Sequence, residues 1–218
     1  MAGSRRSLRA MKASGQLRLT TGRRLISPPS LTTRPTTSRV RESIMNILAA
    51  RLNGSRWLDL CCGSGVIGCE ALERGAAAVI AVDRDSRCTK ICERNLQLIA
   101  DALNTKTELK VICSDLLILL EKGWSSDPFD VVYFDPPYES GLYDNVLNLL
   151  SEGNWIHPDG IVVCEHRSTE SIHVGDQWVL KDQRRYGSSS LMMLSRPELH
   201  HVDTGSRQRQ TGREELRG

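Results

Sequence analysis

Residues 57–68 read Trp-Leu-Asp-Leu-Cys-Cys-Gly-Ser-Gly-Val-Ile-Gly, a short apolar strand that runs into a glycine-rich turn and then a helix. Downstream, short apolar runs alternate with longer helical stretches, which is typical of a parallel sheet covered by helices. We expect strands near 56–60, 78–82, 109–113, 129–134 and 160–165, and helices near 65–75, 85–102, 115–122 and 141–151. Trp178–Leu180 and Leu191–Leu194 predict a closing antiparallel hairpin. Together these elements predict an α/β, Rossmann-like fold with a mostly parallel seven-stranded sheet.

Composition divides the chain into four segments. We expect a flexible basic leader over residues 1–14 and a small basic N-terminal extension with a helix over 15–55. An α/β domain should follow over 56–196, and a disordered tail over 197–218. Pro35, a capping threonine or serine, and the spacing of Val40, Ile44 and Leu48 predict that the helix spans Thr36–Leu52.

Charge is unevenly distributed along the chain. Residues 1–56 contain twelve Lys or Arg and one acid, whereas the rest contains seventeen bases and twenty-five acids. A basic arm on an acidic body predicts a polyanionic partner, such as nucleic acid, held at one end of the molecule. A solvated leader explains the first arginines equally well, but it explains Arg34, Arg39 and Arg41 less well because they lie beside the predicted helix.

The cysteines indicate a reducing compartment. Seven are present without a Cys-x-x-Cys pair or a matching set of histidines, so we expect free thiols and no metal site. No apolar run approaches the roughly 18 residues of a membrane span. We therefore expect a cytoplasmic protein without a membrane partner. The basic, acid-free first dozen residues also fit an organellar transit peptide, and that alternative stays open.

The glycine loop predicts the ligand. Gly63, Gly65 and Gly68 match the GxGxxG pattern of dinucleotide sites, but this signal is weak by itself. Asp59, four residues ahead of the first glycine, offers a carboxylate to a cationic ammonium, which S-adenosylmethionine has and NAD lacks. Glycines also let the backbone approach a ligand closely. We therefore expect S-adenosylmethionine to contact Asp59, Cys61, Gly63 and Gly65.

Further acids end the next two predicted strands. Asp83 lies twenty residues past Gly63, where a carboxylate binds ribose hydroxyls, although it would also serve as a helix cap. Ser114 and Asp115 end the third strand at the same sheet edge, and Asp115 either accepts a hydrogen bond from the adenine amino group or caps the following helix. Acids at the ends of three successive strands favour a ligand site.

Asp135-Pro136-Pro137-Tyr138 follows the apolar run Phe129–Phe134. The prolines fix the backbone and remove two donors, which leaves rigid carbonyl acceptors. If Asp135 and a neighbouring carbonyl accept the two hydrogens of an exocyclic NH2 group, the nitrogen presents its lone pair to a methyl donor. Tyr138 offers a ring for stacking on an extruded base. These features predict a class I S-adenosylmethionine-dependent methyltransferase with these four catalytic residues, although the motif alone also fits a rigid turn.

Several stretches carry a resemblance to a known family. The most specific reads Arg34-Pro35-Thr36-Thr37-Ser38-Arg39-Val40-Arg41-Glu42-Ser43, like the family's RPTxxRVRE. The others are Leu58–Leu60 with Gly63–Gly65, Leu72–Ala76, Asp135–Tyr138, Asn154–Trp155, Val162–His166 and Arg185–Gly187. Over roughly residues 15–195 the chain resembles the RsmD-type methyltransferases, which modify the N2 amino group of a guanine in small-subunit (16S) ribosomal RNA.

The resemblance implies roles for individual residues. It implies that Asp59, Gly63, Gly65, Asp83 and Asp115 line the cofactor pocket, that Asp135, Pro136 and Tyr138 hold the guanine, and that Arg34, Arg39 and Arg41 lie on the RNA side. The implied partner is small-subunit ribosomal RNA within a 30S particle or its assembly intermediate. Two stretches depart from the family. The family's glycine-rich entry strand is compressed at Leu17–Leu25, and Cys61-Cys62 replace an apolar pair that often begins with Phe.

The tetrapeptide leaves other substrates open. Enzymes that methylate adenine N6, guanine N2 or glutamine amides all hold a planar NH2 group. A sequence-specific DNA enzyme usually needs a separate recognition domain, for which this chain has no room. The basic arm favours a phosphate backbone over a protein substrate. A non-catalytic ribosome-assembly factor on a methyltransferase fold is the alternative from another class.

Overall fold

The computed structural model describes residues 16–28, 36–137 and 140–198. Its centre is a seven-stranded sheet in the order β3-β2-β1-β4-β5-β7-β6. The strands are β1 Arg56–Leu60, β2 Ala78–Asp83, β3 Glu108–Cys113, β4 Phe129–Phe134, β5 Ile156–Arg167, β6 Val179–Tyr186 and β7 Ser189–Ser195. The first five strands pair in parallel, whereas β7 pairs antiparallel with both β5 and β6. The predicted fold class is thereby confirmed.

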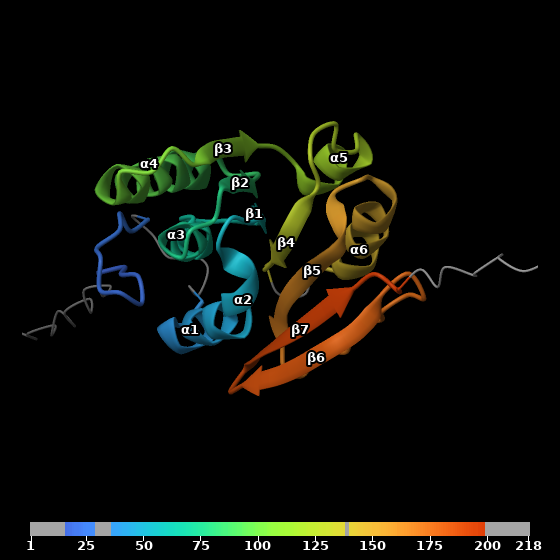
Figure 1. Ribbon diagram of the computed structural model, residues 1–218. Helices are drawn as coiled ribbons and strands as arrows, with labels where there is room; N and C mark the ends of the chain where they lie inside the picture. Colours follow the sequence, from blue (N-terminus) through green and yellow to red (C-terminus); the bar gives the residue numbers. More distant parts are fainter. Residues whose placement is uncertain (1–15, 29–35, 138–139, 199–218) are drawn as a thin grey trace, which may run out of the picture.

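Helices cover both faces of the sheet (Figure 1). They are α1 Ser38–Ile47, α2 Ala49–Leu52, α3 Val66–Glu73, α4 Ser86–Leu103, α5 Leu116–Glu121 and α6 Tyr143–Glu152. Side chains alternate between the faces along each strand, so Trp57 packs with the core under α1, α3 and α4, and Leu58 packs with the core under α5 and α6. Burial on both faces explains why β1, β2 and β4 read as nearly continuous apolar runs.

The helix that we predict over Thr36–Leu52 is interrupted. Leu48 departs from helical geometry with φ −89° and ψ 3°, and it separates α1 from α2. Thr37 is the N-cap of α1, and its hydroxyl accepts a hydrogen bond from the Val40 amide. The prediction of one continuous helix was therefore wrong: α1 begins at Ser38, and the helix is broken at Leu48, whose buried side chain packs in the core.

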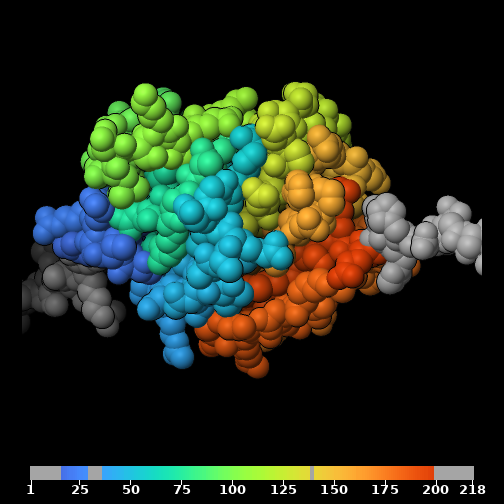
Figure 2. Space-filling view, viewed as in Figure 1, coloured from blue at the N-terminus to red at the C-terminus, as the bar shows by residue number. Residues whose placement is uncertain are grey.

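The segment before α1 packs on the domain. Residues 17–25 form a short hairpin-like turn with an antiparallel bridge between Arg18 and Arg24. In Figure 2 this blue segment lies against α4, where the Asn95 amide oxygen accepts a hydrogen bond from the Ile26 amide at 2.8 Å. The leader at 1–14 and most of the predicted tail lie outside the described residues. Within the described ranges no helix is long and apolar enough to cross a membrane.

Candidate active site

The candidate site lies where the chain direction across the sheet reverses. From β1 the chain runs outward through β2 and β3, and then returns to add β4 and β5 on the other side. Leu60 pairs with Val82 on one side and with Phe134 on the other, so the loops after these strands begin next to one another. Ligands of open α/β sheets bind at such a switch point, outside the carboxyl ends of the strands.

The glycine loop has a backbone that requires its glycines. Gly63 and Gly65 have φ of +53° and +75°, and a Cβ on Gly65 would lie 2.5 Å from the Cys92 sulfur. Gly63 faces open space instead, so nothing in the described chain fills the position above it. Cys61 also takes a positive φ, +63°, which is uncommon for a residue with a side chain. The loop therefore leaves its backbone accessible at Gly63, whereas Cys92 packs directly against Gly65.

Asp59 lies beneath the loop. Its side chain is 2% exposed, and its Oδ2 accepts a hydrogen bond from the Gly68 amide at 3.2 Å, in the first turn of α3. Burial, with a smaller contribution from the nearby Asp83 carboxylate, raises the pKa of the Asp59 carboxyl to about 7, although the Gly68 amide opposes the shift. The carboxyl therefore supports the start of α3, and its contact with a ligand ammonium stays a prediction.

The acids at the end of β2 and after β3 both make backbone contacts. Asp83 accepts hydrogen bonds from the amides of Gly63 and Asp85, each at 2.9 Å, and so joins the end of β2 to the glycine loop. Asp115 is exposed and caps α5 through the amides of Leu117 and Ile118, at 3.0 and 3.3 Å. The capping role weighed for Asp115 is present, and its contact with adenine stays a prediction.

Ser114 and Cys61 lie on the two sides of Asp83. The Ser114 amide donates to the Asp83 carbonyl at 3.1 Å, while the Ser114 hydroxyl donates to the Asp115 carbonyl at 3.0 Å. The Cys61 thiol is half-buried, and its pKa is raised to about 12 by burial and by the carboxylates of Asp83, Asp135 and Asp59. Cys61 therefore lies among the three predicted acids as an uncharged side chain.

Asp135 begins the loop after β4. Its amide donates to the Leu60 carbonyl at 3.5 Å, and its Oδ2 accepts a hydrogen bond from the Thr36 hydroxyl at 3.2 Å. Burial and the Glu165 carboxylate raise the pKa of Asp135 well above its usual range, whereas the Thr36 hydroxyl lowers it. Pro136 is buried and Pro137 is exposed. Tyr138 lies outside the described residues, so its stacking role stays a prediction.

Three side chains around Asp135 were not predicted to belong to the site. Thr36 comes from the segment before α1, while Tyr133 and Glu165 come from β4 and β5. The Tyr133 hydroxyl donates to Glu165 Oε2 at 2.7 Å in the interior. The Tyr143 hydroxyl donates to the Glu165 carbonyl at 2.8 Å. An acid ending an apolar strand was the available signal for Glu165, whereas nothing near Thr36 in sequence pointed to Asp135.

The arginines that we predict on the RNA side differ in their exposure to solvent. Arg39 is exposed on α1, as an RNA contact requires. Arg41 is 4% exposed and pairs with Glu70, which is fully buried, at 3.3 Å. Prediction of an RNA contact for Arg41 was therefore wrong, because its guanidinium is enclosed and already bonded inside the molecule. Arg34 lies outside the described residues.

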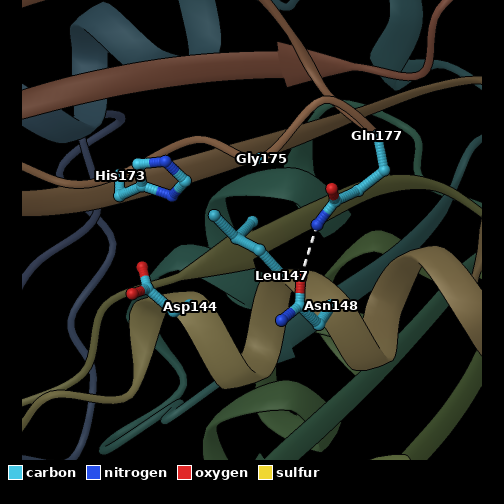
Figure 3. A pocket seen from close by; sticks show the side chains of 6 residues that line it. All are labelled: Asp144, Leu147, Asn148, His173, Gly175 and Gln177. Atoms are coloured by element: carbon cyan, nitrogen blue, oxygen red, sulfur yellow. Dashed lines mark hydrogen bonds between the residues drawn. The ribbon is translucent and has the colours of Figure 1, made fainter.

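A separate pocket lies between α6 and the segment that precedes β6 (Figure 3). It encloses about 300 Å³ and is lined by Asp144, Leu147, Asn148, His173, Gly175 and Gln177. The Gln177 amide donates to the Asn148 side-chain oxygen across it. None of these residues belongs to the predicted site. Among the described residues, no group of three or more His, Cys, Asp or Glu side chains is arranged to hold a metal ion.

The chain is similar in sequence to a known protein family over most of its length. The sequence family described as conserved hypothetical protein 95 matches residues 13–195. The chain belongs to this RsmD-type family. One RsmD-type relative, ribosomal RNA small subunit methyltransferase D of Escherichia coli (strain K12), is 30% identical over 188 residues, which cover 84% of this chain and 91% of the relative.

Two further RsmD-type comparisons agree in length and fold. Putative rRNA methyltransferase YlbH of Bacillus subtilis is 32% identical over 177 residues, covering 80% of this chain and 94% of that protein. The solved structure of the putative methyltransferase yhhF from Escherichia coli superposes with a TM-score of 0.71 at 29% identity, covering 84% of this chain and 98% of that one. The similarity thus spans the whole α/β domain and the N-terminal segment packed on it.

Proposed function

We propose that this RsmD-type chain transfers a methyl group from S-adenosylmethionine to the exocyclic N2 amino group of a guanine in small-subunit (16S) ribosomal RNA. The observation that carries the proposal is the position of Asp135. This carboxyl lies at the switch point of the sheet, next to the glycine loop, and is followed by two prolines. The names of the relatives support ribosomal RNA as the substrate.

The residues present fit the proposed cofactor. Backbone open to a ligand at Gly63, an acid beneath the loop and an acid at the end of β2 match the parts of S-adenosylmethionine. We infer that Asp59 faces the ammonium, that Asp83 binds the ribose hydroxyls, and that Ser114 and Asp115 lie near the adenine. When bound, the cofactor supplies an electrophilic methyl group on a sulfonium.

The protein's contribution is to orient the amino group. A guanine N2 nitrogen is a weak nucleophile because its lone pair is delocalised into the ring. Hydrogen bonds from its two N–H groups to Asp135 and to a carbonyl of the proline turn localise that lone pair and stabilise the charge that develops on nitrogen. Tyr138 would stack on the base. The extra proton leaves to water, so a separate general base is not required.

The RNA is proposed to lie on the basic N-terminal side. Arg39 is exposed two residues past the Thr37 cap of α1, and it lies three residues in sequence from Thr36, whose hydroxyl contacts the catalytic carboxyl of Asp135. Arg34 would extend the same side. A 30S particle or its assembly intermediate, in the cytoplasm, is the proposed setting.

Transfer of labelled methyl groups tests the proposal. Small ribosomal subunits from a strain that lacks the enzyme should accept methyl groups from S-adenosylmethionine, and nucleoside digestion should yield N2-methylguanosine. Asp135→Ala should lower the rate by about 10²–10³-fold, the range for removal of one transition-state hydrogen bond. Asp101→Ala, an exposed change on α4, is the matched control. Methylated adenine in the digest would favour the N6 alternative, and transfer to no subunit or precursor would favour a non-catalytic assembly factor.

A further inference from the structure

Thr36 connects the N-terminal segment to the catalytic loop. Its hydroxyl donates to Asp135 Oδ2 at 3.2 Å, across 99 positions of sequence. The adjacent Thr37 performs the capping of α1, since its own hydroxyl accepts from the Val40 amide at 3.4 Å. Two neighbouring threonines therefore have separate tasks. The helix does not need the Thr36 hydroxyl, which leaves that hydroxyl's contact with Asp135 to be explained.

The backbone of Thr36 is held in place from inside the molecule. Arg41 Nη1 donates to the Thr36 carbonyl at 2.8 Å, and Nη2 donates to the Arg18 carbonyl at 2.6 Å. The third contact of the same guanidinium is the ion pair between Nε and Glu70 Oε1 at 3.3 Å. One buried arginine thus joins the start of α1, the N-terminal turn and α3. A planar guanidinium has donors at fixed angles, so it fixes its partners relative to one another.

Glu70 secures the arginine in turn. Its oxygens also accept from the Thr20 amide at 2.8 Å, from the Thr20 hydroxyl at 2.7 Å and from Arg74 Nη1 at 2.9 Å. The carboxylate is fully buried and its contacts come from two sides. Networks of this kind are rigid when all members are satisfied. The position of Thr36 is therefore determined by a buried network.

An unrestrained aspartate side chain rotates about its last bond, and either oxygen would then face the substrate. A donor fixed on Oδ2 removes that freedom and leaves Oδ1 for the amino group of the substrate. On the basis of the proposed function, we infer that Thr36, anchored by Arg41, is a positioning residue that orients Asp135 for methyl transfer. A hydrogen bond to a carboxylate also favours its ionised form, which is the better acceptor.

The charge of Asp135 depends on neighbouring carboxyl groups and on the Thr36 hydroxyl. Glu165 on β5 and Asp59 on β1 act on the charge of Asp135. The carboxyl of Asp135 in turn raises the pKa values of Tyr133 on β4, Cys61 in the glycine loop and Tyr143 on α6. The two carboxylates disfavour a charge on Asp135, and the Thr36 hydroxyl favours it. Loss of the hydroxyl should therefore raise the pKa of Asp135.

Thr36→Val tests the inference, because valine keeps the shape and removes the donor. We expect kcat to fall about 10–100-fold, with KM for RNA and for S-adenosylmethionine within about twofold of wild type. The acid limb of the pH profile of kcat should move to higher pH. Thr36→Ser should restore both properties, since it retains the hydroxyl. Thr37→Val, which removes the neighbouring hydroxyl and the helix cap, is the matched control and should leave the pH profile unchanged.

A second measurement does not depend on catalysis. Carbon-13 NMR titration of the aspartate carboxyls, with the Asp135 signal assigned through Asp135→Asn, reports the pKa of Asp135 directly. A higher pKa in Thr36→Val than in wild type and Thr36→Ser supports the contact even if no RNA is methylated, in which case only the proposed function fails. An unchanged pKa in Thr36→Val, or equal losses of kcat in Thr36→Val and Thr37→Val, would overturn the inference.

Discussion

At the candidate site Asp59 is buried and Asp135 is half-buried, and burial of a carboxyl group has a thermodynamic cost. Asp59 is 2% exposed, and among the described residues the Gly68 N–H is the amide that donates to its carboxyl group. Asp135 has burial and the Glu165 carboxylate acting against its charge. Burying a charged group with few partners is unfavourable, so such groups persist where they serve function. These buried carboxyls therefore make the folded protein less stable than apolar side chains of the same volume would.

Asp59→Asn should expose that cost. An unfolded aspartate has a pKa of about 3.9, whereas the folded value is about 7. The folded protein therefore binds more protons between about pH 4 and 7, and the free energy of unfolding falls as pH rises through this window. The variant should lose this slope and be more stable than wild type at pH 8, by on the order of 2–4 kcal/mol. Urea unfolding at pH 5 and pH 8 measures the difference.

Asp101→Asn, an exposed change, should leave that pH dependence as in wild type. If wild type and Asp59→Asn differ by the same amount at both pH values, burial of the Asp59 charge is not the cause. Asp59→Asn should also weaken binding of S-adenosylmethionine, because a neutral amide attracts an ammonium less strongly than a carboxylate does.

At the scale of single elements, α1 has two arginines with opposite surroundings. Arg39 and Arg41 are two residues apart, which places them about 200° apart around a helix. The first faces solvent, while the second enters the network with Glu70. The helix therefore carries a candidate RNA contact on one face and a structural anchor on the other.

Arg41→Met should be severely destabilising. Removing Arg41 takes one of the two ion-pair partners described for the buried Glu70 carboxylate and leaves the Thr36 and Arg18 carbonyls without this donor, at a cost of about 3–5 kcal/mol, although Arg74 still pairs with Glu70. Arg39→Met on the same helix should change stability by no more than about 0.5 kcal/mol. Chemical denaturation of both variants measures the contrast. Equal stabilities would mean that the Arg41–Glu70 pair does not support the N-terminal segment.

The elements themselves were largely predictable from sequence, since their patterns are local. The predicted strand at 129–134 is β4, and the hairpin around Arg185 is present. β5 is longer than predicted because His157, Pro158 and Asp159 interrupt its apolar run without ending the strand. Contacts between distant segments were not predictable. The Thr36–Asp135 and Arg41–Glu70 contacts depend on how the N-terminal segment packs, and no periodicity reports that.

At the scale of the whole molecule, charge is divided between a basic N-terminal side and an acidic domain. The division has a direct consequence for RNA binding, because contacts between arginine and phosphate release counterions. The structure restricts the candidates on this side to exposed side chains such as Arg39, and removes Arg41 from them.

Arg39→Met should weaken binding of the substrate RNA and reduce the slope of log K against log salt concentration by about 1, as expected for loss of one phosphate contact. The matched control is Lys106→Met, an exposed cation in the loop that precedes β3, at the amino ends of the parallel strands and therefore away from the candidate site. Affinity measured across a salt series decides. An unchanged slope for Arg39→Met would remove that residue from the RNA surface.

The place of β7 has a consequence for synthesis of the chain. β7 is the last strand along the described part of the chain, yet in the sheet it lies between β5 and β6. Until Ser189–Ser195 has left the ribosome, β5 has an unpaired edge, and its apolar run Val162–Cys164 has no antiparallel neighbour. Such an edge is a template for pairing with another chain. Premature termination before Ser189 should therefore yield an aggregating product, although every residue assigned to the chemistry has by then been made.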